Sequence, residues 1–508
     1  VRIISVQEAA TRTFDVCVVG SGASGAITAA VLAERGLSVL ILEQGTAIPP
    51  GTDHDDVEDP DTWAYARDGE GWSKEGYPWS AMAFGGGTVF YGGISFRYEQ
   101  RDLDPPPALL GDADYAHWRL RLDELEPHYD WVEDRLGVSG PSHGRVGDYA
   151  FPHYARGSLP HTPMGGALAR GADALGLTPL STPMAISGAR DRHGPGCAEL
   201  TPCTGFTCPV NAKADVISRI LARAEGDVSV ALDTRAVRFV ASAPGRAKRL
   251  EVLGGSPRSR RSVHADRFVL AANAIQSAAL LLRSADRREP DGMGNSSGQV
   301  GRHLAMKNSV YVRGRTQERI VAHQPLRHRY SSVCVLDHLR GAEFPGQLGG
   351  IIYEANPWED PEADRPGAGS LLQLECLLGD RPQARNMVRL ARSRDRDGLQ
   401  RIVMDYRQHP LDGERLDVLQ GKAKDVLHAA GAERTESVDS DFATGSTHLH
   451  GTLRAGDDPA TSVTDRTGRL HDYDNVWSAD GATFPFAGNF NPTLTIQANA
   501  RRIAVGIS

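Results

Sequence analysis

The chain has 508 residues, of which 40% are hydrophobic and 24% charged, and its formal net charge at pH 7 is −8. This composition excludes a disordered or fibrous protein and is typical of a globular enzyme large enough for two domains. The net negative charge argues against a nucleic-acid partner.

The sequence carries no signal for a membrane or for export. No window of about 20 apolar residues predicts a membrane span, and the first 14 residues lack the apolar stretch of a signal peptide. Six cysteines in 508 residues do not form a disulfide framework. We therefore expect a cytoplasmic protein that binds neither membranes nor nucleic acids. The oligomeric state stays open.

The first predicted unit is a strand, a glycine-rich turn, a helix and a second strand. Residues 14–20 are mostly apolar, residues 26–35 form an Ala-rich helical pattern, and residues 38–42 predict a second strand that ends at Glu43. The residues of the turn and of the helix start are Gly20, Gly22, Ala23, Ser24 and Gly25. This order of elements is typical of a Rossmann-type dinucleotide site.

Each of these positions has a mechanical role in such a site. Gly20 permits the tight turn, Gly22 lets a pyrophosphate approach the backbone, and Gly25 lets the helix pack closely on the strand. The helix N-terminus presents free N–H groups to the phosphates. Glu43 is placed to bind both ribose hydroxyls, which disfavours a 2′-phosphate. The unit alone does not distinguish FAD from NAD.

Two segments that follow allow more than one interpretation. The acidic run at residues 53–61 is either a solvated loop or an acidic lip at the substrate entrance. The glycine-rich segment at residues 84–97 is either a cluster of turns or a second loop around the cofactor, and its polar and glycine positions include Gly86, Gly87 and Thr88.

A cysteine segment follows, with Cys197, Cys203 and Cys208 before Lys213. Three thiolates and His193 could bind zinc. The spacing is not that of a standard zinc finger, so we expect no metal here, and the cysteines are either structural thiols or a local disulfide.

The rest of the chain predicts a return to the first sheet and a second domain. Residues 233–240 and 267–271 read as strands, and the latter leads through a small-residue turn into an apolar helix. Residues 331–336, 349–354 and 370–378 predict strands of another sheet, and residues 412–430 an amphipathic helix. We expect an α/β fold with an α+β second domain: a discontinuous dinucleotide-binding domain of the Rossmann type over residues 1–310, a substrate domain built on an antiparallel sheet over 311–440, and a C-terminal return over 441–508.

Two motifs near the C-terminus identify a family. The first is His448-Leu-His450-Gly-Thr, and the second is Asp480-Gly481 followed by Asn491-Pro492-Thr493-Leu-Thr. They resemble the closing signatures of the glucose–methanol–choline (GMC) flavin oxidoreductases. The resemblance implies the GMC fold and an FAD-dependent oxidoreductase that acts on CH–OH groups.

The resemblance also implies roles for individual residues. His448 would be the catalytic base and Asn491 its partner beside the flavin. Asp480 and Gly481 would lie on the flavin phosphates or ribityl chain, and Pro492 and Thr493 near the isoalloxazine ring. Gly86, Gly87 and Thr88 would contact the flavin, Val237 the adenine, and His450, at a variable motif position, the substrate. Phe90 stands where some relatives attach FAD through a histidine, so we expect non-covalent FAD.

These roles agree with the chemistry of alcohol oxidation. The reaction needs a base for the hydroxyl proton, which an imidazole can supply, and an acceptor for the hydride, which a flavin supplies. Asn491 could donate to or accept from the substrate oxygen and stabilise it as it loses its proton.

A narrower group within the family is also similar. Residues 85–93, 273–284, 448–463 and 491–498 resemble the FAD-dependent enzymes of aminoglycoside-antibiotic biosynthesis. The resemblance implies oxidation of the 6′-hydroxymethyl group of a paromamine-like intermediate to an aldehyde. Because a hydrated aldehyde is itself an alcohol, a second oxidation to the acid stays open, as does the electron acceptor.

A cationic amino-sugar substrate would favour carboxylates in its pocket. Glu354 and Glu375, on the predicted strands of the substrate domain, are the candidates. The alternative function is oxidation of another sugar, glycoside or small alcohol by the same fold. A lyase that uses FAD only structurally is a third hypothesis, and bleaching of the flavin by substrate would exclude it.

Overall fold

The structure is a computed structural model of residues 1–508. It describes the whole chain apart from residues 55–64, 69–70, 73–79, 111–114, 142–143, 147–148, 153, 155, 191–193, 321–328, 358–359, 364, 366 and 439–446. No helix in the described part is long and apolar enough to cross a membrane.

The first sheet has eight strands. Its order is β1-β9-β3-β2-β12-β11-β10, and β20 also pairs with β12. The strands from β1 to the second half of β12, and β20 beside it, run parallel, whereas β10, β11 and β12 form an antiparallel meander. Their bounds are β1 Arg2–Ile3, β2 Thr13–Val19, β3 Val39–Leu42, β9 Val228–Ala231, β10 Thr234–Ala243, β11 Arg246–Gly254, β12 Ser259–Leu270 and β20 Val476–Ser478.

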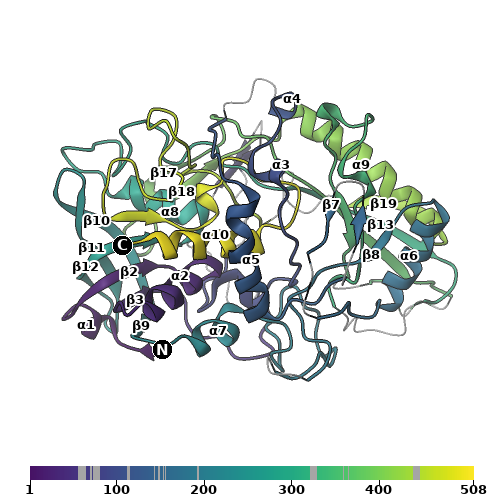
Figure 1. The fold of residues 1–508 in the computed structure, drawn as a ribbon, viewed down its shortest axis with the longest axis horizontal. Helices are drawn as coiled ribbons and strands as arrows, with labels where there is room; N and C mark the ends of the chain where they lie inside the picture. The colour runs from purple at the N-terminus through teal and green to yellow at the C-terminus, as the bar shows by residue number, and fades with distance from the viewer. Residues whose placement is uncertain are drawn as a thin grey trace.

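Helices from both ends of the chain pack together beside this sheet. Helix α2 (Ala23–Glu34) contacts α10 (Thr493–Gly506), which in turn contacts α5 (Leu122–Leu136). In Figure 1 the purple N-terminal elements and the yellow α10 therefore lie side by side on the left. Ten of the twelve residues of α2 are buried, and most of them are small or apolar, so the helix can be enclosed by the sheet and by its neighbours.

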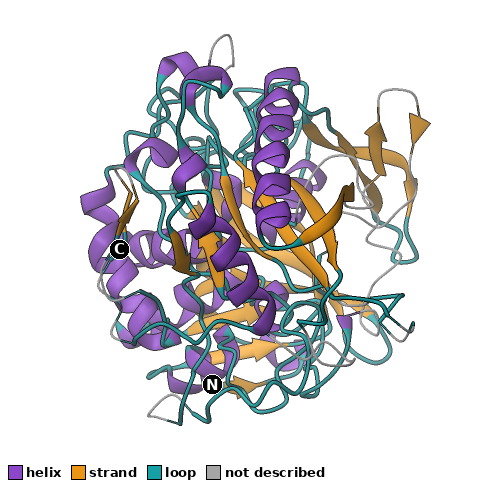
Figure 2. Cartoon of the chain, turned by 90° about the vertical axis from the view of Figure 1, so that its right-hand side faces the viewer, coloured by secondary structure: helices purple, strands orange, loops and turns teal. Residues whose placement is uncertain are grey.

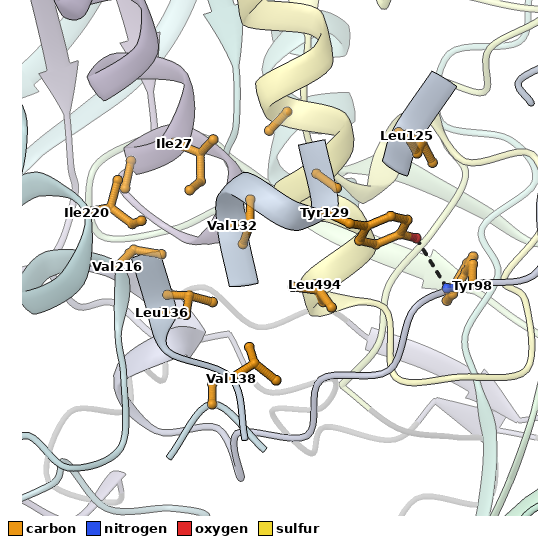
Figure 3. Packing of buried hydrophobic residues seen from close by; sticks show 14 of the residues in the cluster. Ile27, Tyr98, Leu125, Tyr129, Val132, Leu136, Val138, Val216, Ile220 and Leu494 are labelled. Atoms are coloured by element: carbon orange, nitrogen blue, oxygen red, sulfur yellow. Dashed lines mark hydrogen bonds between the residues drawn. The ribbon is translucent and has the colours of Figure 1, made fainter. Parts of the chain in front are cut away.

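Side chains from these three helices share one hydrophobic core. Ile27 of α2, Val132 and Leu136 of α5, and Leu494 of α10 are each at most 2% exposed, and Figure 3 shows them converging. Full burial of such a side chain contributes about 1.5–3 kcal/mol. The Tyr129 hydroxyl accepts a hydrogen bond from the Tyr98 backbone N–H at 3.2 Å, which satisfies a polar group inside this core.

The second sheet has six strands in the order β19-β13-β16-β15-β14-β8, all antiparallel. The strands are β8 Pro179–Ser181, β13 Asn308–Thr316, β14 Val333–Val335, β15 Ile351–Glu354, β16 Leu371–Leu378 and β19 Ala432–Val438. Helices α6 (Pro163–Ala174) and α9 (Pro410–Ala429) pack on it, on the right of Figure 1, and Figure 2 shows helices lying across the strands.

A four-stranded sheet in the order β17-β18-β4-β5 completes the larger elements. Its strands are β17 Met387–Arg394, β18 Gln400–Asp405, β4 Tyr65–Asp68 and β5 Gly71–Trp72, and β17 packs on α8 (Asn273–Arg283). The remaining elements are α1 Val6–Ala9, η3 Gly86–Val89, α3 Gln100–Leu103, α4 Pro107–Leu110, β6 Arg145–Val146, β7 Tyr149–Ala150, α7 Val216–Arg219, η4 Leu221–Arg223, η5 Asp337–Leu339, η6 Pro345–Gln347 and η7 Gly481–Thr483.

The expected fold class is therefore present, with parallel strands in the first sheet and an antiparallel second sheet. The strands expected at residues 331–336, 349–354 and 370–378 correspond to β14, β15 and β16, and the helix expected at 412–430 is α9. Residues 163–181, which form α6 and β8, join the second sheet although they precede residue 311. Conversely, β17 lies against α8 of the first domain.

Candidate active site

A cavity of about 1350 Å³ lies between the two large sheets. Its walls include Val19 and Leu42 at the carboxyl ends of β2 and β3, and Ala271 just beyond β12. Ligands of open parallel sheets bind outside these strand ends. The volume exceeds the roughly 300–1,000 Å³ of an ordinary small-molecule site, so there is room for a large cofactor and a substrate.

The first glycine turn is built by close backbone packing. Gly20 has a φ of +100°, and a Cβ there would lie 2.4 Å from the carbonyl oxygen of Ala271. A Cβ on Gly25 would lie 2.0 Å from the carbonyl oxygen of Gly20. Both positions therefore require glycine. Helix α2 begins at Ala23 with Gly22 as its N-cap and no side-chain cap, so its first N–H groups stay available to an anion.

The second glycine loop meets the first one backbone to backbone. A Cβ on Gly86 would lie 2.9 Å from the Cα of Gly22, and one on Gly22 would lie 3.8 Å from the Cα of Gly86. Thr88 donates its hydroxyl to the Gly85 carbonyl at 2.7 Å. Gly86, Gly87 and Thr88 line the cavity together with Gly22.

Ser21 joins three segments at this point. Its hydroxyl donates to Glu43 Oε2 at 2.6 Å and accepts from the Gly85 N–H at 2.9 Å. Its own N–H also donates to Glu43 Oε2 at 3.0 Å, and Gly45 N–H donates to Glu43 Oε1 at 2.8 Å. Burial raises the pKa of Glu43, and these hydrogen bonds oppose the shift. The carboxylate is thus held rigidly at the cavity wall.

Asp480, just beyond β20 of the same sheet, is held in a comparable way. Its Oδ2 accepts from the Ser277 hydroxyl at 2.6 Å, and its Oδ1 accepts from Ala482 N–H at 3.0 Å. Burial raises its pKa. Asp480 and Gly481 both line the cavity.

His448 lines the cavity. Burial, with a contribution from the positive charge of Lys307, lowers the pKa of His448 to about 3. The imidazole is therefore neutral near pH 7, which is the form that accepts a proton.

Lys307 is itself fully buried just before β13. Its Nζ donates to the carbonyl oxygens of Ala487 and Gly488 at 2.6 and 2.7 Å and lies 5.2 Å from the centre of the Tyr98 ring. Burial lowers its pKa well below the ordinary value. Lys307 thus fastens the loop that leads to Asn491.

Asn491 also lines the cavity, beside Tyr353 of the second sheet, and is followed in the chain by Pro492 and Thr493 at the start of α10. It is 6% exposed, and its Nδ2 donates to the Tyr353 hydroxyl at 3.3 Å. Within the described residues its Oδ1 has no hydrogen-bond partner. A buried acceptor of this kind is costly unless a ligand supplies the donor.

One face of the second sheet forms the cavity wall opposite the glycine loops. Tyr311 of β13 pairs with Glu375 of β16, which also pairs with Tyr353 of β15. Because side chains alternate along a strand, the cavity residues recur every second position. They are Ser309, Tyr311, Arg313, Tyr353, Gln373 and Glu375.

Two family descriptions match the chain. One, GMC oxidoreductase, matches residues 382–500, and the other, NAD(P)-binding Rossmann-like domain, matches residues 18–62. The chain is 41% identical to 6′′′-hydroxyparomomycin C oxidase of Streptomyces lividus and 40% identical to paromamine 6′-oxidase of Streptomyces fradiae. Each alignment covers 98% of this chain and 92% of the relative. The chain belongs to the GMC oxidoreductase family.

The fold comparison agrees with this assignment. Pyridoxine 4-oxidase from Mesorbium loti superposes with a TM-score of 0.68 at 20% identity, and the match covers 97% of this chain and 98% of that one. The protein is thus an FAD-dependent GMC oxidoreductase with a small-molecule substrate, and FAD is its cofactor.

The residues present in this GMC oxidoreductase fit FAD. Gly22 and Gly86 approach each other closely, and a Cβ on either residue would reduce the space that the two loops leave for the cofactor. The uncapped start of α2 suits the pyrophosphate, and the buried Glu43 suits a ribose. Phe90, at 2% exposure, also lines the cavity.

The expectation that Glu354 contacts the substrate is not supported by the structure. Glu354 is fully buried and does not line the cavity. It accepts hydrogen bonds from the Ser332 N–H at 2.6 Å and from the hydroxyls of Ser332 and Thr162, the N-cap of α6. Its neighbour Tyr353 faces the cavity instead, because adjacent strand residues point to opposite faces.

Two further residues, His450 and Val237, do not line the cavity as the sequence had led us to expect. His450 is fully buried behind the cavity wall of the GMC oxidoreductase, where its Nε2 meets the Tyr98 hydroxyl at 3.3 Å. Its backbone pairs with Ala305, which fixes the strand-like segment before Gly451. Val237 lies behind the wall on β10, where Ala236 lines the cavity.

The cysteine segment contributes part of the cavity wall. Cys197, Cys203 and Cys208 are all free thiols, and Leu200, Thr201, Pro202, Thr204, Gly205 and Phe206 line the cavity. The buried Lys213 ammonium donates to the carbonyl oxygens of Cys203 at 2.6 Å and Tyr91 at 2.8 Å, so it ties this segment to the glycine loop. His193 and most of the acidic run at 53–61 lie outside the described residues.

Sequence reasoning missed the tyrosines of the cavity wall and Lys307. Tyr311 and Tyr353 read as ordinary strand residues until the register between β13, β15 and β16 is known, and Tyr330 lies in the segment before β14. A signal was available in β13, where Ser309, Tyr311 and Arg313 alternate with Val310 and Val312. This alternation indicates one polar face toward a cavity.

Proposed function

We propose that this enzyme oxidises the 6′-hydroxymethyl group of a paromamine-like aminoglycoside to the aldehyde. The observation that carries the proposal is the near full-length identity of 40–41% to two enzymes named as oxidases of paromamine and of a hydroxylated paromomycin. Both His448 and Asn491, which we propose as the reacting side chains, line the cavity.

The proposed catalytic base is His448. Since its pKa is lowered to about 3, the imidazole enters the reaction unprotonated at neutral pH and can take the proton of the substrate hydroxyl. When bound, FAD would supply the acceptor for the hydride that leaves the carbon bearing this hydroxyl. Asn491, which also lines the cavity, would hold the reacting oxygen while its proton leaves.

The proposed FAD-binding residues lie on the other walls. Gly20, Gly22, Ala23, Ser24 and the start of α2 would hold the pyrophosphate, with Gly25 allowing the helix to lie close to β2. Glu43 would hold the ribose. Gly86, Gly87, Thr88, Asp480, Gly481, Pro492 and Thr493 would surround the flavin half. Because Phe90 has no nucleophilic atom, FAD would be bound non-covalently.

Glu375 is the proposed contact for a cationic substrate. It is the carboxylate on the cavity face of the second sheet, beside Tyr330 and Tyr353. A carboxylate in a partly enclosed pocket steers and orients an ammonium group. Arg313 lies on the same face, two residues beyond Tyr311, and its Nε–H donates to Gln373 Oε1 at 2.6 Å. Its positive charge would repel the substrate ammonium from that side of the pocket.

Anaerobic mixing of the FAD-loaded enzyme with paromamine, and separately with glucose, tests the proposal. We expect paromamine to bleach the flavin absorbance and to yield an aldehyde, whereas glucose leaves the spectrum unchanged. Bleaching by glucose or a simple alcohol, but not by paromamine, would retain the GMC assignment and contradict the substrate. Admission of air afterwards shows whether oxygen reoxidises the flavin.

A further inference from the structure

The amide of Asn491 is held on one side and unpaired on the other. Its Nδ2 donates to the Tyr353 hydroxyl at 3.3 Å, whereas its buried Oδ1 has no hydrogen-bond partner within the described residues. Asn491 is 6% exposed and lines the cavity. The amide therefore carries an acceptor that the protein itself does not fill.

A chain of hydrogen bonds determines which way this amide is turned. Tyr353 lies opposite Glu375 across strands β15 and β16, and the Glu375 carboxylate accepts from Ser309 at 2.6 Å and from Tyr330 at 2.8 Å. A carboxylate only accepts, and a tyrosine hydroxyl has a single proton. This neighbouring carboxylate favours the orientation in which the Tyr353 proton points toward Glu375 and the Tyr353 oxygen accepts from Asn491. If the Asn491 amide were flipped, its Oδ1 would face the Tyr353 hydroxyl oxygen, and neither atom would have a proton to donate.

The substrate hydroxyl cannot fill the vacant acceptor on Asn491. It has one proton, and under the proposed function that proton goes to His448. The second N–H of the Asn491 amide remains available to the reacting oxygen as it loses this proton. The Oδ1 atom consequently needs a different donor, and the substrate is the group that enters this part of the cavity.

We propose that Glu375 and Tyr353 are positioning residues that keep the Asn491 Oδ1 available for a second hydroxyl of the substrate. This hydroxyl is on the ring carbon next to the one that bears the reacting hydroxymethyl group, since it is the nearest ring donor to the reacting carbon. The inference rests on the proposed function, because it takes His448 as the base. It makes the enzyme selective for a sugar ring over a simple primary alcohol.

Paromamine and its 4′-deoxy analogue, which lacks only that second hydroxyl, test the inference. The full-length, FAD-loaded enzyme is mixed anaerobically with each compound over a range of concentrations, and the rate of flavin bleaching is followed. A site built to bind a hydroxyl rejects the analogue that lacks it strongly. We expect wild type to prefer paromamine by about 10²-fold or more in the apparent second-order rate constant.

The Tyr353→Phe variant removes the bond that fixes the amide. Both compounds should react more slowly in this variant. The ratio of their rate constants should fall toward one, because the released Asn491 amide can turn its N–H group toward the place of the second substrate hydroxyl. Tyr406→Phe is the matched control. Tyr406 is also a buried tyrosine that donates to a buried carboxylate, Asp380 at 2.7 Å, but it does not line the cavity. A merely structural effect would leave the preference intact in both variants.

Each outcome decides the inference. Equal bleaching of wild type by the two compounds, or an unchanged preference in Tyr353→Phe, overturns it while the proposed function stands. Bleaching by neither compound overturns the proposed function and this inference with it. If Tyr353→Phe does not retain FAD, Glu375→Gln replaces it, because the new amide can donate to Tyr353 and reverse the chain of bonds. That variant should also lose the preference.

Discussion

Gly86 and Gly22 touch through their backbones, so that a single added methyl group on Gly86 would lie 2.9 Å from the Cα of Gly22. The contact brings the turn after β2 against the start of η3 at the cavity wall. The two loops that would surround the cofactor phosphates can therefore approach this closely only because neither glycine has a side chain.

Gly86→Ala should weaken FAD binding by at least about tenfold, which corresponds to about 1.4 kcal/mol. The added methyl group pushes the two loops apart and also strains a residue with a φ of +54°. Titration of the apoprotein with FAD, followed by flavin fluorescence, measures the change. Gly36→Ala is the control, since Gly36 has a φ of +86° but nothing within 4 Å of an added Cβ. Equal FAD affinities in the two variants would contradict the explanation.

Ser21→Ala should also lower FAD affinity, because it removes the hydroxyl that connects Glu43 to the Gly85 N–H. Loss of a buried hydrogen bond to a charged group costs about 1.5–3 kcal/mol. Part of that cost should appear in thermal unfolding and part in the dissociation constant for FAD. Ser38→Ala removes a similar serine–carboxylate bond, to Asp15, at the other end of the same strands. It should change the unfolding temperature and leave FAD affinity as in wild type.

His448→Asn should reduce kcat by about 10²–10⁴-fold, the usual contribution of a general base. Rapid-reaction measurement of flavin bleaching at saturating substrate gives the number directly. The flavin spectrum of the variant checks that the cofactor is still bound. A decrease of less than fivefold with normal FAD content would show that another group takes the hydroxyl proton.

The pH profile should reveal the environment of His448. Because burial and Lys307 lower its pKa to about 3, the neutral imidazole persists well below its ordinary pKa of about 6.5. The acid limb of kcat/KM that belongs to this residue should therefore lie below pH 6.5. Lys307→Met removes a positive charge, so the pKa of His448 should rise and the limb should move to higher pH. An unmoved limb in a variant with full FAD content would mean that Lys307 is neutral.

Glu354→Gln should destabilise the fold without altering substrate binding. Its carboxylate accepts from Ser332 and Thr162 at the start of α6, and the loss of these charge-assisted bonds inside the protein should cost about 2–3 kcal/mol. Thermal unfolding measures the decrease. The KM for paromamine should stay within twofold of wild type, whereas a large rise in KM would restore Glu354 as a substrate residue.

The cofactor half of the site could be predicted from the sequence because its signals are local. The turn from Gly20 to Gly25, the strand before it and Glu43 after the second strand stand close together in the chain, and the structure brings them to one wall of the cavity. Family resemblance pointed to His448 and Asn491, and both residues line the same cavity.

The substrate half depended on strand register, which the sequence does not reveal. A shift of one residue moves a side chain to the other face of a sheet. Glu354 and Tyr353 are neighbours in β15, and the residue expected at the cavity turned out to face α6. Val237 and Ala236 are likewise neighbours on β10, so their side chains point to opposite faces, and Ala236 is the one that lines the cavity. Lys307 escaped notice because a lone lysine beside a strand normally lies in solvent.

The packing of α2 against α10 has a consequence for how the protein is made. Val19 and Ile496 line the same cavity, so its walls draw on residues from the first and the last parts of the chain. While the polypeptide is still emerging from the ribosome, the early turn around Gly22 is complete but its covering segments are not yet synthesised. Stable capture of the cofactor must therefore wait until residue 496 has been synthesised and has folded onto the early segments, and cells short of riboflavin should accumulate chains that proteases attack at the empty cavity.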